Sequence, residues 1–67
     1  MSFSQKIKTV RQTCFMSQEA LAKELGVSFA TVNRWETGKS KPSYKTLKQI
    51  DGFCKENGIM IDIHEDY

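Results

Sequence analysis

Hydrophobic residues recur at helical spacing in four separate segments of the chain, and a serine stands at the start of each segment. Apolar side chains three and four positions apart lie on one face of a helix, and a serine can cap the free N–H groups of its first turn. The pattern therefore predicts four helices, over about residues 2–13, 17–26, 28–38 and 43–57. Ser2 and Gln5 have the spacing of a capping box, and Gly26 and Gly38 suit the left-handed conformation that ends many helices.

The fourth segment contains a glycine, Gly52, among its apolar positions. Glycine in a helix interior costs about 1 kcal/mol relative to alanine. A local packing reason for Gly52 is therefore expected.

The last nine residues follow a different period, because Ile59, Ile61 and Ile63 alternate with Met60, Asp62 and His64. Alternation of this kind is typical of a strand, and a lone strand is not stable in water. The segment 59–67 is therefore expected to pair with its two-fold mate in a dimer, to pack on its own helices, or to fray. A dimer through the fourth helix is a further alternative.

With 67 residues, the chain can bury one small core, which excludes a barrel, a doubly wound sheet or a two-domain enzyme. The fold class expected is all-α: a compact domain of four helices over residues 1–58, followed by an acidic tail with a possible short β-strand. The net charge of +2 is an average over these two parts. Residues 1–58 hold ten basic and five acidic side chains, a net of +5, whereas residues 59–67 hold three acidic ones, a net of −3.

Several classes of protein lack support in the sequence. No apolar run is long enough to span a membrane and no signal peptide stands at the start, so we expect a cytoplasmic protein. Cys14 and Cys54 are far apart and are expected to be free thiols that fill core space. His64 is the only histidine, so we expect no metal, no cofactor, no small-molecule ligand and no catalytic pair of nucleophile and base.

The middle of the chain has the spacing of a helix-turn-helix. Ala22 provides a small residue where two helices cross, Gly26 provides the turn, and Val32 and Trp35 face the core from the second helix. Trp35 is accordingly predicted to be a core residue rather than a stacking platform for single strands. The opposite face of that second helix is left to enter a major groove.

The segments 17–28 (SQEALAKELGVS) and 32–43 (VNRWETGKSKPS) resemble the Xre-type, phage-repressor-like helix-turn-helix family, and the resemblance spans about residues 6–59. It implies a lambda-repressor-like domain that binds DNA, usually as a homodimer on a two-fold operator. It also implies a pair between Arg11 and Glu36. The chain departs from the family at Phe15, where a small or polar residue is usual. Phe29 and Ala30 stand where several relatives carry long polar residues.

The residues expected to contact DNA fall into two groups. Candidates for base contacts are Phe29, Ala30, Asn33 and Arg34, with Thr31 reaching either a base or a phosphate. Two alternatives stay open: Asn33 could bind adenine or a phosphate, and Phe29 could meet a thymine methyl or pack against protein. Phosphate contacts are expected from the following residues: Gln18, Ser28, Thr37, Lys39, Ser40, Lys41, Tyr44 and Lys45.

These observations predict a sequence-specific double-stranded DNA-binding protein, a repressor-like transcriptional regulator with residues 28–37 in the major groove. Bound to DNA, it would be associated with the nucleoid. The alternative is a protein-interaction module of the same fold, such as an antitoxin or adaptor. An enzyme and a membrane partner are not expected.

Overall fold

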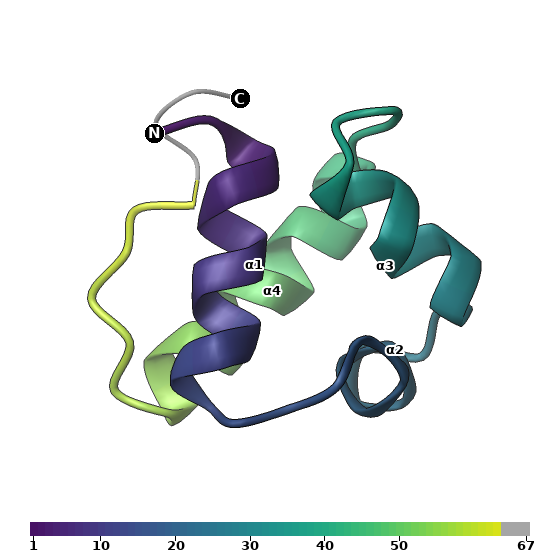
Figure 1. The fold of residues 1–67 in the computed structure, drawn as a ribbon. Coiled ribbons are helices and arrows are strands. Elements are labelled where there is room, and N and C mark those ends of the chain that lie inside the picture. The colour runs from purple at the N-terminus through teal and green to yellow at the C-terminus, as the bar shows by residue number, and fades with distance from the viewer. Residues whose placement is uncertain (64–67) are drawn as a thin grey trace.

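Four helices make up the chain over residues 1–63, the part that the computed structural model describes. They are α1 (Phe3–Thr13), α2 (Gln18–Leu25), α3 (Phe29–Glu36) and α4 (Tyr44–Glu56). In Figure 1, α1 crosses in front of α4, α2 and α3 lie to one side of this pair, and residues 59–63 run along the other side. The all-α prediction is confirmed. None of the described helices is long and apolar enough to cross a membrane.

Each helix begins at the serine that the sequence indicated. The side chains of Ser2, Ser17, Ser28 and Ser43 accept a hydrogen bond from the backbone N–H three residues later. At Ser2 the capping box is complete, because the side chain of Gln5 also accepts from the backbone N–H of Ser2 at 3.1 Å. Local sequence alone therefore sets where the helices begin.

The four helices also end alike, with a left-handed residue after the last turn. The residue after the left-handed one donates its backbone N–H to the carbonyl five residues earlier. Met16 donates in this way to Arg11 at 3.1 Å, and Val27 to Ala22 at 2.9 Å. Three of the left-handed positions are glycines, with φ between 66° and 76°. The fourth is Phe15, with φ of 55° and a side chain that is 97% exposed. The aromatic residue flagged as unusual thus occupies a position that favours glycine.

A single core lies where the four helices meet. Ile7, Val10, Leu21, Val32 and Ile50 are completely buried. Trp35 is 2% exposed, and its ring packs edge-on against that of Phe3, with centroids 6.4 Å apart and planes at 80°. The prediction of Trp35 as a core residue is confirmed.

The described part of the tail, residues 59–63, is extended chain and forms no strand. Ile63 is 1% exposed and belongs to the core, while Ile59 and Ile61 pack against it and Met60 is 96% exposed. Lys6, itself buried, donates from Nζ to the backbone carbonyl of Asp62 at 2.8 Å. The alternation of isoleucines therefore arises because this segment packs on its own helices, one of the alternatives left open. His64, Glu65, Asp66 and Tyr67 lie outside the described residues.

The expectation that local packing explains the glycine at position 52 is wrong. A Cβ atom built on Gly52 would meet no atom within 4 Å, and its φ is not left-handed. Gly52 lines a shallow hollow between α4 and the end of α2, so open space rather than crowding surrounds it.

Candidate nucleic-acid interface

Helix α3 has one buried face and one exposed face. Val32 and Trp35 point into the core, whereas the four predicted base-contacting residues are exposed. Those four are Phe29, Ala30, Asn33 and Arg34. The helical period places Ala30, Asn33 and Arg34 on the side away from Val32 and Trp35, and Phe29 at the edge between the two faces. The structure therefore brings the predicted base contacts onto one surface, which we call the α3 face.

Arg34 is the only basic residue in α3. Within residues 1–63, its guanidinium takes part in no ion pair or hydrogen bond. Among the described residues, Arg34 therefore does not pair with a neighbouring acid. A free guanidinium on an exposed helix face can form two parallel hydrogen bonds with guanine O6 and N7.

Phe29 begins α3 and is 54% exposed. The exposed half of its ring forms an apolar surface at the start of the α3 face. Ala30 is also exposed and apolar, so this end of the helix carries no charged side chain. Apolar groups in a major groove contact the methyl group of thymine.

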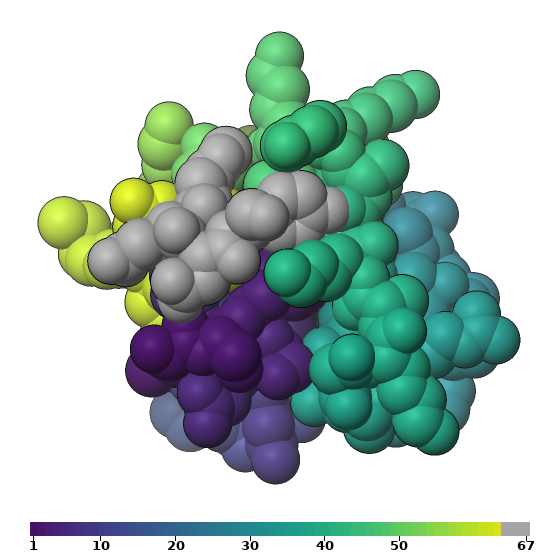
Figure 2. Space-filling model, turned by 90° about the horizontal axis from the view of Figure 1, so that it is seen from above, coloured from purple at the N-terminus to yellow at the C-terminus, as the bar shows by residue number. Residues whose placement is uncertain are grey.

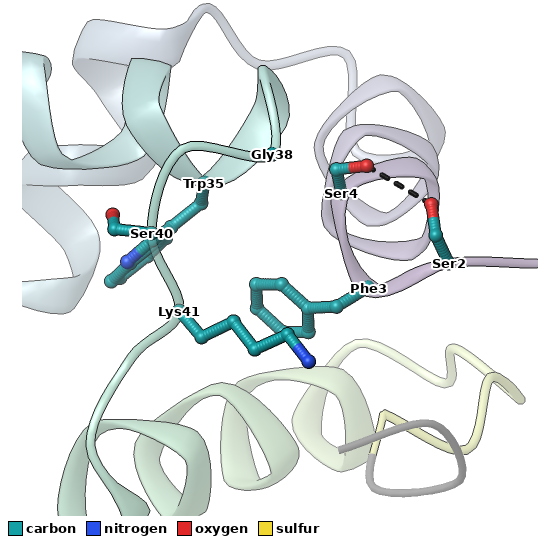
Figure 3. Close-up of a pocket in the computed structure, with 7 residues that line it drawn as sticks. All are labelled: Ser2, Phe3, Ser4, Trp35, Gly38, Ser40 and Lys41. Carbon is teal, nitrogen blue, oxygen red and sulfur yellow. Dashed lines mark hydrogen bonds between the residues drawn. The ribbon is translucent and has the colours of Figure 1, made fainter.

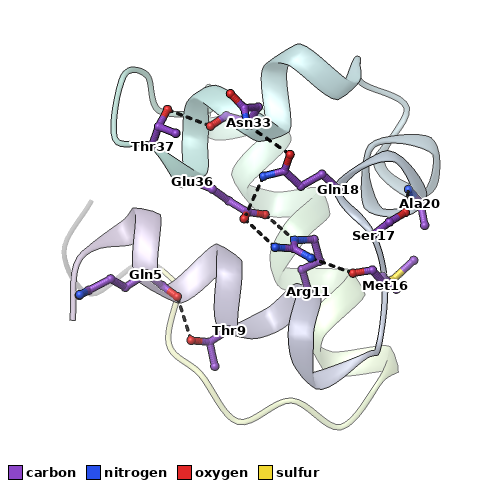
Figure 4. Close-up of polar contacts among 10 residues, drawn as sticks. All are labelled: Gln5, Thr9, Arg11, Met16, Ser17, Gln18, Ala20, Asn33, Glu36 and Thr37. Atoms are coloured by element: carbon purple, nitrogen blue, oxygen red, sulfur yellow. Dashed lines mark hydrogen bonds and ion pairs between the residues drawn. The ribbon is translucent and has the colours of Figure 1, made fainter.

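A chain of polar side chains connects α1, α2 and α3 (Figure 4). Arg11 donates to the Glu36 carboxylate twice, from Nε to Oε2 at 2.7 Å and from Nη2 to Oε1 at 3.0 Å. Gln18 donates from Nε2 to Glu36 Oε1 at 3.2 Å, and Asn33 donates from Nδ2 to Gln18 Oε1 at 3.3 Å. The pair that the resemblance implied is formed, and it extends to two of the predicted DNA contacts.

The charged end of this chain is enclosed. The Glu36 side chain is 4% exposed and that of Arg11 16%. The hydrogen bond with Glu36 raises the pKa of Arg11 above its ordinary value, although burial lowers it. Arg11 also donates from Nη1 to the carbonyl of Met16 at 3.0 Å, which fixes the turn between α1 and α2.

The hydroxyl groups of Ser28, Thr31 and Thr37, which were predicted to contact phosphate, form hydrogen bonds within the domain. Ser28 Oγ accepts from the Thr31 N–H at 3.1 Å and lies 2.8 Å from Thr31 Oγ1. The Thr37 hydroxyl donates to the backbone carbonyl of Asn33 at 2.9 Å. The hydroxyls of Ser28 and Thr31 therefore stabilise the start of α3, and that of Thr37 stabilises its end.

The connection between α3 and α4 carries the other predicted phosphate contacts. Lys39, Ser40, Tyr44 and Lys45 are exposed, with Tyr44 at 80%. Lys41 is exposed too, but its side chain extends across Phe3 towards the start of α1 (Figure 3). There it lines an open hollow of about 230 Å³ together with Phe3, Trp35 and Ser40. The structure thus sets Lys41 apart from the other predicted phosphate contacts.

The described part of the tail, residues 59–63, lies away from the α3 face. Figure 2 looks down on the top of Figure 1 and shows residues 59–63 and helix α3 at opposite sides of the molecule. Asp62 lies on that far side, because its carbonyl is bound to Lys6 on α1. Asp62 is therefore remote from the α3 face in space as well as in sequence.

Both cysteines are free thiols, as expected, and Cys54 belongs to the core. Burial, with the nearby charge of Asp51, raises the pKa of the Cys54 thiol to about 11. A thiol with so high a pKa is a poor nucleophile at neutral pH. In residues 1–63, no three side chains of the His, Cys, Asp or Glu type gather as metal ligands would.

The link from Glu36 through Gln18 to Asn33 is the feature that the sequence analysis missed. Gln18 and Asn33 were each assigned to DNA separately, although they lie 15 positions apart and meet only when α2 and α3 cross. The polar residue at the first position of α2 and the implied Arg11–Glu36 pair were the available clues.

Comparison with known proteins places these features in a family. A model of the helix-turn-helix family matches residues 7–57. The chain is 38% identical over 53 residues to the HTH-type transcriptional activator BcrR of Enterococcus faecalis, covering 79% of this chain and 26% of that protein. It is 40% identical over 50 residues to the plasmid copy control protein CopR of Streptococcus agalactiae, covering 75% of this chain and 52% of that protein. The chain therefore spans about a quarter and about half of the lengths of these relatives. No solved structure matches it significantly.

Proposed function

The chain belongs to the helix-turn-helix family, and we propose on that basis that it is a sequence-specific double-stranded DNA-binding domain of a transcriptional regulator. Of the two relatives, one is named a transcriptional activator and the other a plasmid copy control protein. We therefore propose regulation in general, since the names do not favour the repressor-like action expected from the sequence. The family is one of DNA-binding domains, which supports the expectation that the chain is not an enzyme.

The observation that carries the proposal is the exposed side of α3. Arg34 stands there without a partner in the described residues, beside the exposed amide of Asn33. An α-helix fits the major groove, and arginine and asparagine are residue types that bind base edges there. We propose that α3 docks in the major groove, with Phe29 and Ala30 against apolar groups of the bases and Thr31 beside them.

Phosphate contacts would come from both sides of α3. On one side lie the first turn of α2, with Gln18, and Ser28 at the start of α3. On the other side lies the connection to α4, with Thr37, Lys39, Ser40, Tyr44 and Lys45. Their hydroxyl, amide and ammonium groups are of the kinds that bind phosphate oxygens and hold a domain in register on the duplex. Lys41 would contribute less, because its side chain extends towards α1.

A homodimer on a two-fold site is part of the proposal. Two copies would place their α3 helices about one helical turn of DNA apart. The tail packs on its own helices, with Ile63 1% exposed, so its isoleucines do not form an apolar surface for a second copy. The other dimer surface that the sequence analysis considered is α4.

A salt titration on a short duplex tests the proposal. Each phosphate contact releases counterions, so the logarithm of the affinity should fall linearly with the logarithm of salt concentration, with a slope of about 0.9 per contact. A chain that binds no duplex in low salt would not be a DNA-binding domain.

The second candidate is a protein-interaction module, and the exposure of Phe29 favours it. A half-exposed aromatic side chain at the start of α3 is a typical anchor for a protein partner. The substitutions Arg34→Ala and Phe29→Ala separate the two functions. Loss of duplex binding in Arg34→Ala supports the DNA-binding domain, whereas a protein partner lost only in Phe29→Ala supports the interaction module.

A further inference from the structure

The polar chain that joins α1 to α3 is anchored by a group that can only accept hydrogen bonds. Glu36 receives two hydrogen bonds from the guanidinium of Arg11, at 2.7 and 3.0 Å, and its side chain is 4% exposed. An ionised carboxylate has acceptor oxygens and no donor, and arginine has donors and no acceptor. The direction of every further hydrogen bond from Glu36 is therefore fixed by chemistry.

This direction passes to Gln18. Only the NH₂ group of an amide can donate to a carboxylate, so Gln18 must turn Nε2 towards Glu36 Oε1, which is 3.2 Å away. The Gln18 carbonyl oxygen then faces α3. The two ends of a glutamine amide are nearly equivalent in shape, and here the neighbouring carboxylate distinguishes them.

The same direction passes on to Asn33. Its Nδ2 donates to Gln18 Oε1 at 3.3 Å, which consumes one of its two N–H groups. The carbonyl oxygen Oδ1 and the second N–H remain, on a side chain that is exposed on the α3 face. The outward edge of Asn33 thus presents one acceptor and one donor.

We propose that the Arg11–Glu36 pair and Gln18 orient the amide of Asn33 to bind adenine in the major groove. Adenine presents an acceptor, N7, beside a donor, the N6 amino group, and an asparagine amide of this orientation is complementary to both. Guanine presents two acceptors there, and a phosphate presents only acceptors, so Oδ1 would face an acceptor in either case. Asn33 determines the base, whereas Gln18 and Glu36 act as positioning residues. This inference rests on the proposed DNA-binding function.

The experiment begins with the wild-type chain and a pool of random duplexes, from which bound sites are selected and sequenced. Affinities are then measured for the selected duplex and for duplexes with each base pair replaced. The same set is measured with Asn33→Ala and with Gln18→Met, which has a similar length and no amide. Gln49→Met is the matched control, since Gln49 lines the hollow at the other end of α2.

The proposal predicts one position at which the wild type prefers adenine by about 10- to 100-fold, the range of a bidentate asparagine contact. Asn33→Ala should lose this preference at that position and keep the others. Gln18→Met should reduce the preference at the same position by about 5-fold or more, because the Asn33 amide is then free to turn. Gln49→Met should keep it unchanged.

Three results would overturn the proposal. An Asn33→Ala variant that weakens all duplexes equally would identify Asn33 as a phosphate contact. An adenine preference retained in Gln18→Met would show that Gln18 does not orient Asn33. A wild-type chain that binds no duplex would overturn both this inference and the proposed function, whereas the first two results leave the proposed function intact.

A measurement without DNA provides a separate check. In the wild type, one proton of the Asn33 side-chain amide should exchange with solvent more slowly than its partner, as followed by nuclear magnetic resonance. In Gln18→Met the two protons should exchange at similar rates. Similar rates in the wild type would overturn the proposed orientation.

Discussion

Arg11 on α1 and Glu36 at the end of α3 form a two-pronged ion pair, with Nε 2.7 Å from Oε2 and Nη2 3.0 Å from Oε1. The pair joins α1 to α3 through two residues that are 25 positions apart in sequence. Because Glu36 is enclosed and also receives a hydrogen bond from Gln18, the pair fixes how α3 lies on the rest of the domain. The position of the α3 face therefore depends on it.

Removal of one partner of the Arg11–Glu36 pair should lower the stability of the domain. Arg11→Met leaves an enclosed carboxylate without its counter-charge, and we expect a loss of about 3 kcal/mol in the free energy of unfolding. The double variant Arg11→Met with Glu36→Leu should lose less than the sum of the two single variants. Urea denaturation of the four proteins measures this coupling, and strictly additive losses would contradict it.

Gly52 offers a simple way to stabilise the domain. Alanine fits at this position without a clash, so Gly52→Ala should raise the free energy of unfolding by about 1 kcal/mol. For a domain of this size, that corresponds to a rise in Tm of roughly 4–8 °C. Gly26→Ala is the control, because φ of 71° at Gly26 penalises any side chain. It should lower the Tm, and equal effects of the two substitutions would refute the argument.

Phe15 is held in a conformation that costs a residue with a Cβ atom about 1–2 kcal/mol. Phe15→Gly should therefore stabilise the domain by roughly 0.5–1 kcal/mol, once the greater freedom of glycine in the unfolded chain is included. Phe29→Gly, which places glycine in an ordinary helical position, should destabilise it. Thermal unfolding followed by circular dichroism distinguishes these signs, and a lower Tm for Phe15→Gly would contradict the prediction.

The two thiols should differ in reactivity. Cys54 is buried and has a pKa raised to about 11, whereas Cys14 is partly exposed. At pH 8, iodoacetamide should therefore modify Cys14 in the native protein and Cys54 only after unfolding. Mass spectrometry of the labelled peptides gives both rates, and equal rates in the native protein would show that Cys54 is accessible.

The parts of the fold that sequence predicted are those set by local chemistry. Each serine cap acts within three residues of its own position, so the starts of the helices could be read from spacing. The exposed side of α3 followed from Val32 and Trp35, because the helical period fixes which residues lie opposite them.

The features that escaped prediction depend on contacts across the chain or on patterns with two meanings. Gln18 and Asn33 meet only because α2 and α3 cross. The isoleucines of residues 59–63 alternate as a strand does, but any extended segment that packs on a core shows the same period. At Gly52, the sequence suggested that close packing would explain a glycine within a helix, but the structure shows no atom close enough to require one.

The central claim is that the α3 face binds duplex DNA. It is tested most directly by the affinity of the wild type, Arg34→Ala and Lys55→Ala for one selected duplex at a single salt concentration. Lys55→Ala is the control, because this substitution also removes one positive charge. Lys55 lies in the last turn of α4, and Figure 1 shows that this end of α4 is away from α3. We predict a loss of about 10-fold or more for Arg34→Ala and little change for Lys55→Ala. Equal affinities for the wild type and Arg34→Ala would contradict the account.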